Sequence, residues 1–256
     1  MTTEKFVAEI LGTMILILLG DGVVAGVLLA KTKCTMTGVL GSGGWVLITI
    51  GWGMAVFSGI AVAGQFSGAH INPAVSFAVF IQAQLSGSGT FGVDSLLLYW
   101  VGQFIGAMIG ATLVFLHYYP HWAETEDKGL KLAVFCTAPA IRNPLWNLVS
   151  EIVGTFTLVF VGFSLVSTPS APIGGALGWG LLVLVIGLGL GSTTGYAINP
   201  ARDLGPRIMH YLLPIPGKGH SDWEYSWIPV VGPLIGGACG VLVYYYLITQ
   251  FIAKAA

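Results

Sequence analysis

Two Asn-Pro-Ala triplets, Asn72-Pro73-Ala74 and Asn199-Pro200-Ala201, are the most specific chemical signal in the sequence. A loop of small residues precedes each triplet, and a run that suits a short helix follows it. Proline is tolerated in the first turn of a helix, and asparagine just ahead of it is a good N-cap. Helix N-termini carry roughly +0.5 elementary charge, so two of them facing each other would oppose cations and protons. The asparagine amides would donate hydrogen bonds to a small polar solute.

The elements that position these triplets repeat along the chain. Three segments recur in the same order: 8–20 as 150–162, 67–75 as 194–202, and 101–110 as 231–240. Each copy holds three membrane spans, an odd number, so the second copy must be inverted relative to the first. Inverted repeats with paired broken segments indicate a solute pathway near the membrane midplane. We therefore expect one domain, 1–256, with repeats 1–118 and 146–256 joined by a loop at 119–145.

The composition requires a membrane around the molecule. Of the 256 residues, 55% are hydrophobic and 8% are charged, whereas a soluble domain carries about 25% charged residues. A helix needs about 20 apolar residues to span the hydrocarbon. The segments that qualify are 5–29, 43–64, 93–118, 146–167, 173–193 and 226–252. The first should be a retained span rather than a cleaved signal, and the shorter pieces 66–85 and 195–213 should enter the membrane and leave it as half-helices.

Other classes of protein find little support in the sequence. The net charge of −1 argues against nucleic acid as a partner. Cys34, Cys136 and Cys239 have no CxxC spacing, so neither a disulfide framework nor a metal site is expected. No set of nucleophile, base and acid is evident, so we expect neither an enzyme nor a cofactor.

Two repeat-equivalent carboxylates, Glu9 and Glu151, lie inside predicted spans. We expect them to accept hydrogen bonds from the backbone N–H groups of the re-entrant loops, because backbone at membrane depth must be satisfied internally. Asp21 is expected to make a structural polar contact, with solute binding as the alternative, and His70 to tether its loop, with a gate as the alternative. The loop carbonyls would then line a pore as acceptors; they belong to Gly68, Ala69, His70, Ile71, Gly195, Tyr196, Ala197 and Ile198.

The motifs SGAHINPAV and GYAINPARDLGPR, with the repeated openings AEILGT and SEIVGT, resemble those of the aquaporin (major intrinsic protein) family along essentially the whole chain. The resemblance is strongest to its aquaglyceroporin, or bacterial glycerol facilitator, branch. It implies an all-α fold with six transmembrane helices in a right-handed bundle and two half-helices that meet at their triplets. It also implies a homotetramer in the cell membrane, surrounded by lipid, with one pore per subunit. The termini would be cytoplasmic, whereas the lysine distribution by itself would place them outside.

The resemblance places a selectivity filter at Trp52, Gly187, Tyr196 and Arg202. Trp52 and Tyr196 would form an apolar corner for a carbon backbone, and Arg202 would donate hydrogen bonds to hydroxyls on the opposite edge. An arginine inside the membrane is costly and indicates function. Water-selective relatives have histidine in place of Gly187, so Gly187 would leave room beside Arg202; the alternative is a glycine for helix packing. Tyr196 departs from the phenylalanine usual in bacterial glycerol facilitators.

Asp203, directly after the second triplet and its arginine, resembles a marker of the same branch. It can pair with Arg207 at a helical spacing of four residues. The alternative is an acid that simply caps the half-helix. Pro229 also matches the branch, and Val230 replaces its usual leucine.

The sequence thus predicts a passive channel for glycerol, water and other small uncharged solutes that excludes ions and protons. Alternatives within this class are a water-selective pore, or a channel whose main solute is urea, hydrogen peroxide or lactic acid. A secondary transporter would make uptake depend on an ion gradient, and a structural membrane protein would conduct nothing.

Overall fold

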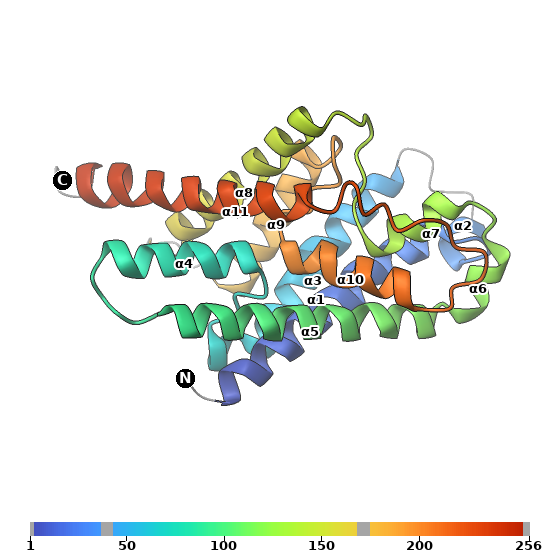
Figure 1. The fold of residues 1–256 in the computed structure, drawn as a ribbon, viewed down its shortest axis with the longest axis horizontal. Coiled ribbons are helices and arrows are strands. Elements are labelled where there is room, and N and C mark those ends of the chain that lie inside the picture. Colours follow the sequence, from blue (N-terminus) through green and yellow to red (C-terminus); the bar gives the residue numbers. More distant parts are fainter. Residues whose placement is uncertain (1–2, 37–42, 168–174, 253–256) are drawn as a thin grey trace.

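The structure, a computed structural model, describes residues 3–36, 43–167 and 175–252 (Figure 1). Within these ranges the chain forms helices and loops and no strand, so the predicted all-α fold is confirmed. The long helices are α1 (Thr3–Leu28), α3 (Gly43–Ser67), α5 (Val93–His117), α8 (Pro144–Ser167) and α11 (Ile228–Val243), which continues as the π-helix η1 (Tyr244–Ile252). The shorter helices are α2 (Lys33–Met36), α4 (Pro73–Leu85), α6 (Tyr119–Glu124), α7 (Lys128–Phe135), α9 (Ala176–Leu190) and α10 (Pro200–Leu212).

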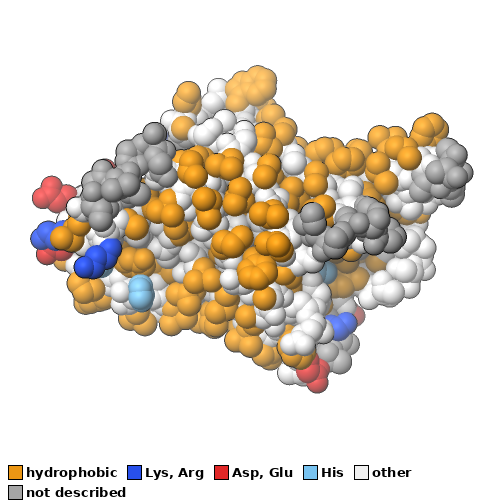
Figure 2. All heavy atoms as spheres, turned by 180° about the vertical axis from the view of Figure 1, so that it is seen from behind, with side chains coloured by type: hydrophobic (Ala, Val, Ile, Leu, Met, Phe, Trp, Pro, Cys, Tyr) orange, Lys and Arg blue, Asp and Glu red, His pale blue; other side chains and the backbone are white. Residues whose placement is uncertain are grey.

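Five helices in the described ranges are long and apolar enough to cross a membrane. They are Thr3–Met36, Gly44–Ser67, Val93–His117, Pro144–Val166 and Ile228–Ile252. The remaining predicted span, 173–193, corresponds to α9, which has 15 residues and begins just after a stretch that lies outside the described ranges. Figure 2 shows apolar side chains over the middle of one face and charged side chains towards its two ends, as a surface in contact with lipid requires.

The helices pack in the same way in both halves of the chain. α1 packs against α3 and α5, and its counterpart α8 packs against α9 and α11. The two halves meet where α3 crosses α9, at Gly53 and Gly180. A Cβ atom at Gly53 would lie 2.7 Å from the carbonyl oxygen of Gly180, and one at Gly180 would lie 2.6 Å from that of Gly53. Small residues are needed at this crossing because the two backbones approach so closely.

The half-helices α4 and α10 lie beside α5 with their N-terminal ends towards each other (Figure 1). The triplets start both helices. The Asn72 side-chain oxygen accepts from the Ala74 N–H at 2.8 Å, and that of Asn199 accepts from the Ala201 N–H at 3.0 Å. A proline follows each asparagine in the first helical turn. The local chemistry of the triplet therefore sets where each half-helix begins.

The connection between the halves, predicted as a loop at 119–145, contains the short helices α6 and α7. α6 has Pro120 in its first turn, and the N-cap of α7 is Asp127, whose carboxylate accepts from the Gly129 N–H at 2.7 Å. The hydrophobic pattern was too short and too charged to indicate these helices. With α2, they form the end of the molecule opposite the α4–α5 connection (Figure 1).

Candidate functional site

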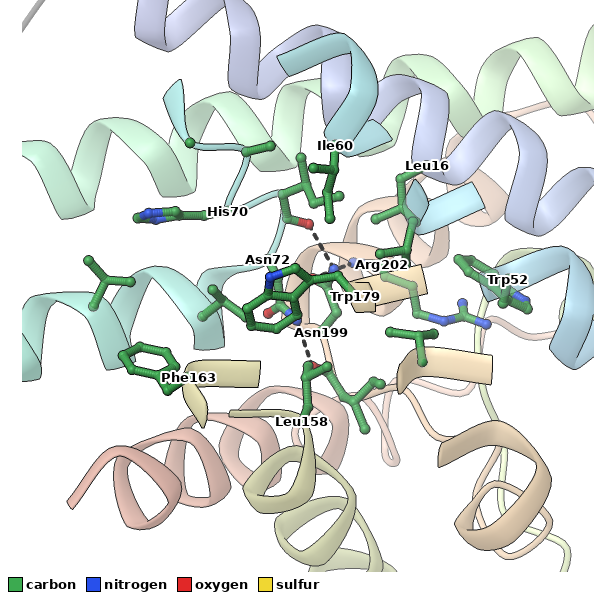
Figure 3. A pocket seen from close by; sticks show the side chains of 18 of the residues that line it. Leu16, Trp52, Ile60, His70, Asn72, Leu158, Phe163, Trp179, Asn199 and Arg202 are labelled. Carbon is green, nitrogen blue, oxygen red and sulfur yellow. Dashed lines mark hydrogen bonds between the residues drawn. The ribbon is translucent and has the colours of Figure 1, made fainter. Parts of the chain in front are cut away.

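A cavity of about 290 Å³ runs between the two half-helices and the long helices around them (Figure 3). Both triplet asparagines line it, together with residues 68–71 of the first re-entrant loop and 196–198 of the second. Of the loop residues expected to line the pore, Gly195 is the exception. The cavity is mostly apolar, with a few polar groups that converge on it, which is the usual composition of a site for a small organic molecule.

The two asparagines brace the half-helices against each other. The Asn72 Nδ2 donates to the Ile198 carbonyl at 2.8 Å, and the Asn199 Nδ2 donates to the Ile71 carbonyl at 2.9 Å. Figure 3 shows these two bonds crossing the centre of the site. Each amide has a second hydrogen, which the crossed bond does not use. Each asparagine therefore makes one structural hydrogen bond and has one further N–H donor at the middle of the cavity.

The re-entrant loops share an unusual backbone conformation. In the first loop Gly68, Ala69 and Ile71 have φ values of +79°, +48° and +43°. In the second, the equivalent Gly195, Tyr196 and Ile198 have φ values of +84°, +39° and +43°. Positive φ is rare for residues other than glycine, especially β-branched ones, and such positions cost on the order of 1–3 kcal/mol each. This strain persists in both loops because other groups hold them in place.

Glu9 holds the first loop. One of its carboxylate oxygens accepts from the His70 N–H at 2.9 Å and from the Ser67 hydroxyl at 2.6 Å. The other accepts from the Ile71 N–H at 2.8 Å and the Gln103 side chain at 2.7 Å. This buried carboxylate is therefore fully hydrogen-bonded, as a charge at membrane depth requires.

Glu151 holds the second loop in the same way. Its carboxylate accepts from the Ala197 N–H at 3.0 Å, the Ile198 N–H at 2.9 Å and the Thr194 hydroxyl at 2.7 Å. Both glutamates thus have their hydrogen-bonding capacity committed to loop geometry.

At one end of the cavity, Arg202, Trp52 and Tyr196 form a cluster. The Arg202 guanidinium carbon lies 4.0 Å from the centre of the Trp52 ring. The Tyr196 ring contacts Trp45 edge-on, with 5.8 Å between ring centres. The three side chains line the cavity, and all are buried. Hydrogen-bond donors and flat apolar surfaces therefore border the same passage.

Gly187 does not line this cavity. A Cβ atom there would lie 2.8 Å from both Cζ of Tyr196 and Cγ2 of Thr49, and one at Gly191 would lie 2.4 Å from Cδ1 of Tyr196. The space that Gly187 leaves is thus occupied by the Tyr196 ring rather than open beside Arg202. We call these two glycines the Tyr196 notch. Gly187 therefore affects the shape of the passage indirectly, because it leaves space for the Tyr196 ring, which lines the cavity.

Asp203 and Arg207 form a fully buried ion pair, with Arg207 Nη2 2.8 Å from Asp203 Oδ1. Asp203 also accepts from the N–H of Thr137 at 2.7 Å and from its hydroxyl at 2.6 Å. Arg207 donates to the carbonyls of Thr137, Ser221 and Asp222. The pair therefore ties two surface loops to α10, a larger role than that of a simple capping acid.

The other predicted positions have structural contacts. His70 lies 3.1 Å from the Ser76 hydroxyl through its Nδ1 and packs against Tyr99, with 4.7 Å between ring centres, although it also borders the cavity. Pro229 is in the first turn of α11. Within the described residues, no group of three or more His, Cys, Asp or Glu side chains is placed to hold a metal ion.

The cavity lining also contains residues that the sequence did not predict, among them Ile60, Val75, Phe163 and Trp179. Trp179 is the counterpart of Trp52, since IGWG at 50–53 recurs as LGWG at 177–180. Each ring packs on a glycine, because a Cβ at Gly20 would lie 2.3 Å from Trp52 and one at Gly162 would lie 2.2 Å from Trp179. The repeated tetrapeptide was the signal that could have identified Trp179.

Long apolar helices, two half-helices that meet at their N-termini and a cavity lined from both halves define a multi-pass membrane protein of the channel type. The family model described as major intrinsic protein matches residues 1–244, and the chain belongs to this family.

Relatives and a solved structure cover nearly the whole chain. It is 49% identical over 240 residues to glycerol uptake facilitator protein 3 of Lactiplantibacillus plantarum, covering 94% of this chain and 95% of that protein. It is 52% identical over 244 residues to the glycerol uptake facilitator protein of Streptococcus pneumoniae, covering 95% and 99%. The X-ray structure of the aquaglyceroporin from Plasmodium falciparum superimposes with a TM-score of 0.79 at 28% identity, covering 99% of both chains.

Proposed function

We propose that this chain is a passive membrane channel for glycerol, which also passes water and other small uncharged solutes and excludes ions and protons. The observation that carries this proposal is the Arg202 cluster, in which the guanidinium lies 4.0 Å from the Trp52 ring beside Tyr196. A polyol presents hydroxyls on one edge and carbon on the other. The guanidinium can donate to its hydroxyls while the rings contact its carbon backbone.

The residues act in sequence along the passage. Trp52, Tyr196 and Arg202 select the solute, with Gly187 admitting the Tyr196 ring. The spare amide hydrogens of Asn72 and Asn199 then receive it at the centre, where the half-helix ends keep the potential positive. Carbonyls of the re-entrant loops offer acceptors along the path, and Glu9 and Glu151 hold those loops in place. Asp203, with Arg207, anchors the two surface loops that contain Thr137 and Ser221.

Family membership also supports a proposal about the assembly and its membrane setting. We propose that the chain is one unit, 1–256, made of inverted repeats 1–118 and 146–256, and that four copies assemble with one pore each. The assembly would lie in the cell membrane with both termini in the cytoplasm. The names of the relatives support glycerol as a solute.

Permeability of proteoliposomes tests the proposal. Purified full-length protein is reconstituted, and volume changes after glycerol or sucrose gradients are followed by stopped-flow light scattering. Glycerol should enter faster than through protein-free vesicles, without saturation at millimolar concentrations. A rise in water permeability alone would contradict glycerol conduction and leave a water-selective pore.

A further inference from the structure

Asp21 is a buried carboxylate near the Arg202 end of the cavity. It lies in α1 with none of its surface exposed, and neither of its oxygens has a hydrogen-bond partner in the described part of the chain. The other buried carboxylates, Glu9, Glu151 and Asp203, are all hydrogen-bonded. A buried charge without hydrogen bonds needs an opposite charge nearby.

The charge that faces Asp21 is Arg202. Its Nη1 lies 3.8 Å from Asp21 Oδ1, and this same nitrogen has no hydrogen-bond partner among the described residues. Arg202 is in the first turn of α10, where the positive end of the helix disfavours a cation. A carboxylate from α1 relieves this unfavourable placement.

Asp203 cannot serve Arg202, although it is the next residue along the chain. One of its oxygens accepts from two Arg207 nitrogens, at 2.9 and 2.8 Å. The other accepts both the N–H and the hydroxyl of Thr137. The arrangement therefore contains two separate acid–base pairs, Asp203 with Arg207 and Asp21 with Arg202.

The fold itself does not require an acid at position 21. The repeats align Gly20-Asp21 with Gly162-Phe163, so Asp21 corresponds to Phe163 in the other half. Phe163 is a buried ring that lines the opposite end of the cavity. The carboxylate is thus present only in the half whose cavity end carries the arginine.

We propose that Asp21 is the counter-charge of Arg202 and cancels the charge of its guanidinium, so that the passage excludes small anions as well as cations. This inference rests on the proposed role of Arg202 in selecting the solute. An uncompensated guanidinium beside a helix N-terminus would attract anions. With Asp21 in place, the guanidinium offers hydrogen-bond donors to an uncharged solute without a net positive field.

The test compares nitrate with glycerol in proteoliposomes of the full chain. Nitrate stays an anion at every accessible pH, and valinomycin with potassium allows it to move without building up a potential. The variants are Asp21→Asn and Asp21→Ser, which remove the charge, and Asp21→Glu, which keeps it. Thr13→Val is the matched control, because Thr13 is also buried in α1 with an unpartnered hydroxyl in the described chain but has no charge.

Wild type and Thr13→Val should pass glycerol and leave nitrate at the level of bare lipid. An opposite charge within about 4–6 Å shifts an ionic equilibrium by about one to three powers of ten. Nitrate would lie farther from Asp21 than Arg202 does, so the smallest of these effects applies. We therefore expect nitrate permeability to rise about tenfold in Asp21→Asn and Asp21→Ser. Glycerol permeability should change by less than about threefold, because glycerol is uncharged and a threefold change corresponds to only a small change in the free-energy barrier. Asp21→Glu, which keeps the negative charge, should exclude nitrate as wild type does.

The outcomes separate this inference from the proposed function. If wild type conducts no glycerol, the proposed function fails. If wild type conducts glycerol but neither uncharged variant admits nitrate, the counter-charge role is overturned while the proposed function stands. Loss of glycerol permeability in both uncharged variants would make Asp21 a structural residue and would also overturn the inference.

Discussion

Small residues affect the shape of this cavity by leaving space for the side chains of other residues. Tyr196 has positive φ, and its ring fits into the notch formed by Gly187 on α9 and Gly191, the C-cap of that helix. The position of the ring therefore depends on the absence of side chains one turn apart on a neighbouring helix. A residue that never touches the solute can still set the width of the passage.

Gly187→Ala should narrow the passage by displacing the Tyr196 ring. The added Cβ would lie 2.8 Å from Tyr196 Cζ, closer than van der Waals contact permits. Overpacking costs typically 1–3 kcal/mol, so glycerol permeability should fall roughly tenfold if a similar cost enters the barrier, and water permeability should fall less. Gly189→Ala is the control, because a Cβ there meets nothing within 4 Å. Stopped-flow measurements at equal protein density compare the two, and equal effects of both alanines would contradict the notch.

At the scale of elements, a carboxylate from a long helix stabilises each strained loop. Glu9 on α1 and Glu151 on α8 accept equivalent pairs of backbone N–H groups. The first loop has additional support from Gln103, whose counterpart in the repeat is Pro233. The two loops are therefore alike in shape and unequal in the number of bonds that hold them.

Removal of a loop carboxylate should destabilise the protein. Glu151→Ala leaves the Ala197 and Ile198 N–H groups without their acceptor, at a cost of about 1–3 kcal/mol each. The apparent Tm in detergent should fall by several degrees. Glu126→Ala, at an exposed position, should leave the Tm nearly unchanged. An unchanged Tm in Glu151→Ala would show that the loop keeps its shape without the carboxylate.

The sequence predicted the elements better than the contacts between them. The spans and half-helices could be predicted because hydrophobic length and the triplet N-caps are local signals. The α6–α7 connection was missed because its helices are short and charged. The contacts of Thr137 with Asp203 and of Asp21 with Arg202 join positions far apart in the chain, and a single sequence does not show which distant residues meet. The sequence predicted open space at Gly187 beside Arg202, and only the coordinates show that the Tyr196 ring occupies this space.

At the scale of the whole molecule, the two halves meet at the centre, where we expect one electrostatic barrier to act on every cation. α4 and α10 direct their N-termini at the same region, and the crossed bonds from Asn72 and Asn199 fix them there. A proton that moved along a file of waters would have to pass this positive region. The barrier belongs to the pair of repeats and not to either one alone.

Proton conduction should therefore be absent while glycerol conduction is present. The measurement applies a pH gradient across proteoliposomes that contain a pH-sensitive dye. The same preparation is first shown to pass glycerol. The gradient should decay no faster than in protein-free vesicles, because the helix N-termini oppose the proton. Faster decay in glycerol-conducting vesicles would contradict the electrostatic barrier.

The two ends of the cavity match in backbone and differ in chemistry. The counterparts of Trp52, Tyr196 and Arg202 in the other repeat are Trp179, Ala69 and Val75, so one end offers a guanidinium and the other an apolar wall. This asymmetry cannot act as a valve. For an uncharged solute with no energy source, the forward and reverse permeabilities through any fixed path are equal, however unlike its ends are. Net uptake through such a path would then depend only on the concentration difference, which consumption of the solute inside the cell maintains. Whenever the outside concentration fell below the inside one, the solute would leave through the same opening.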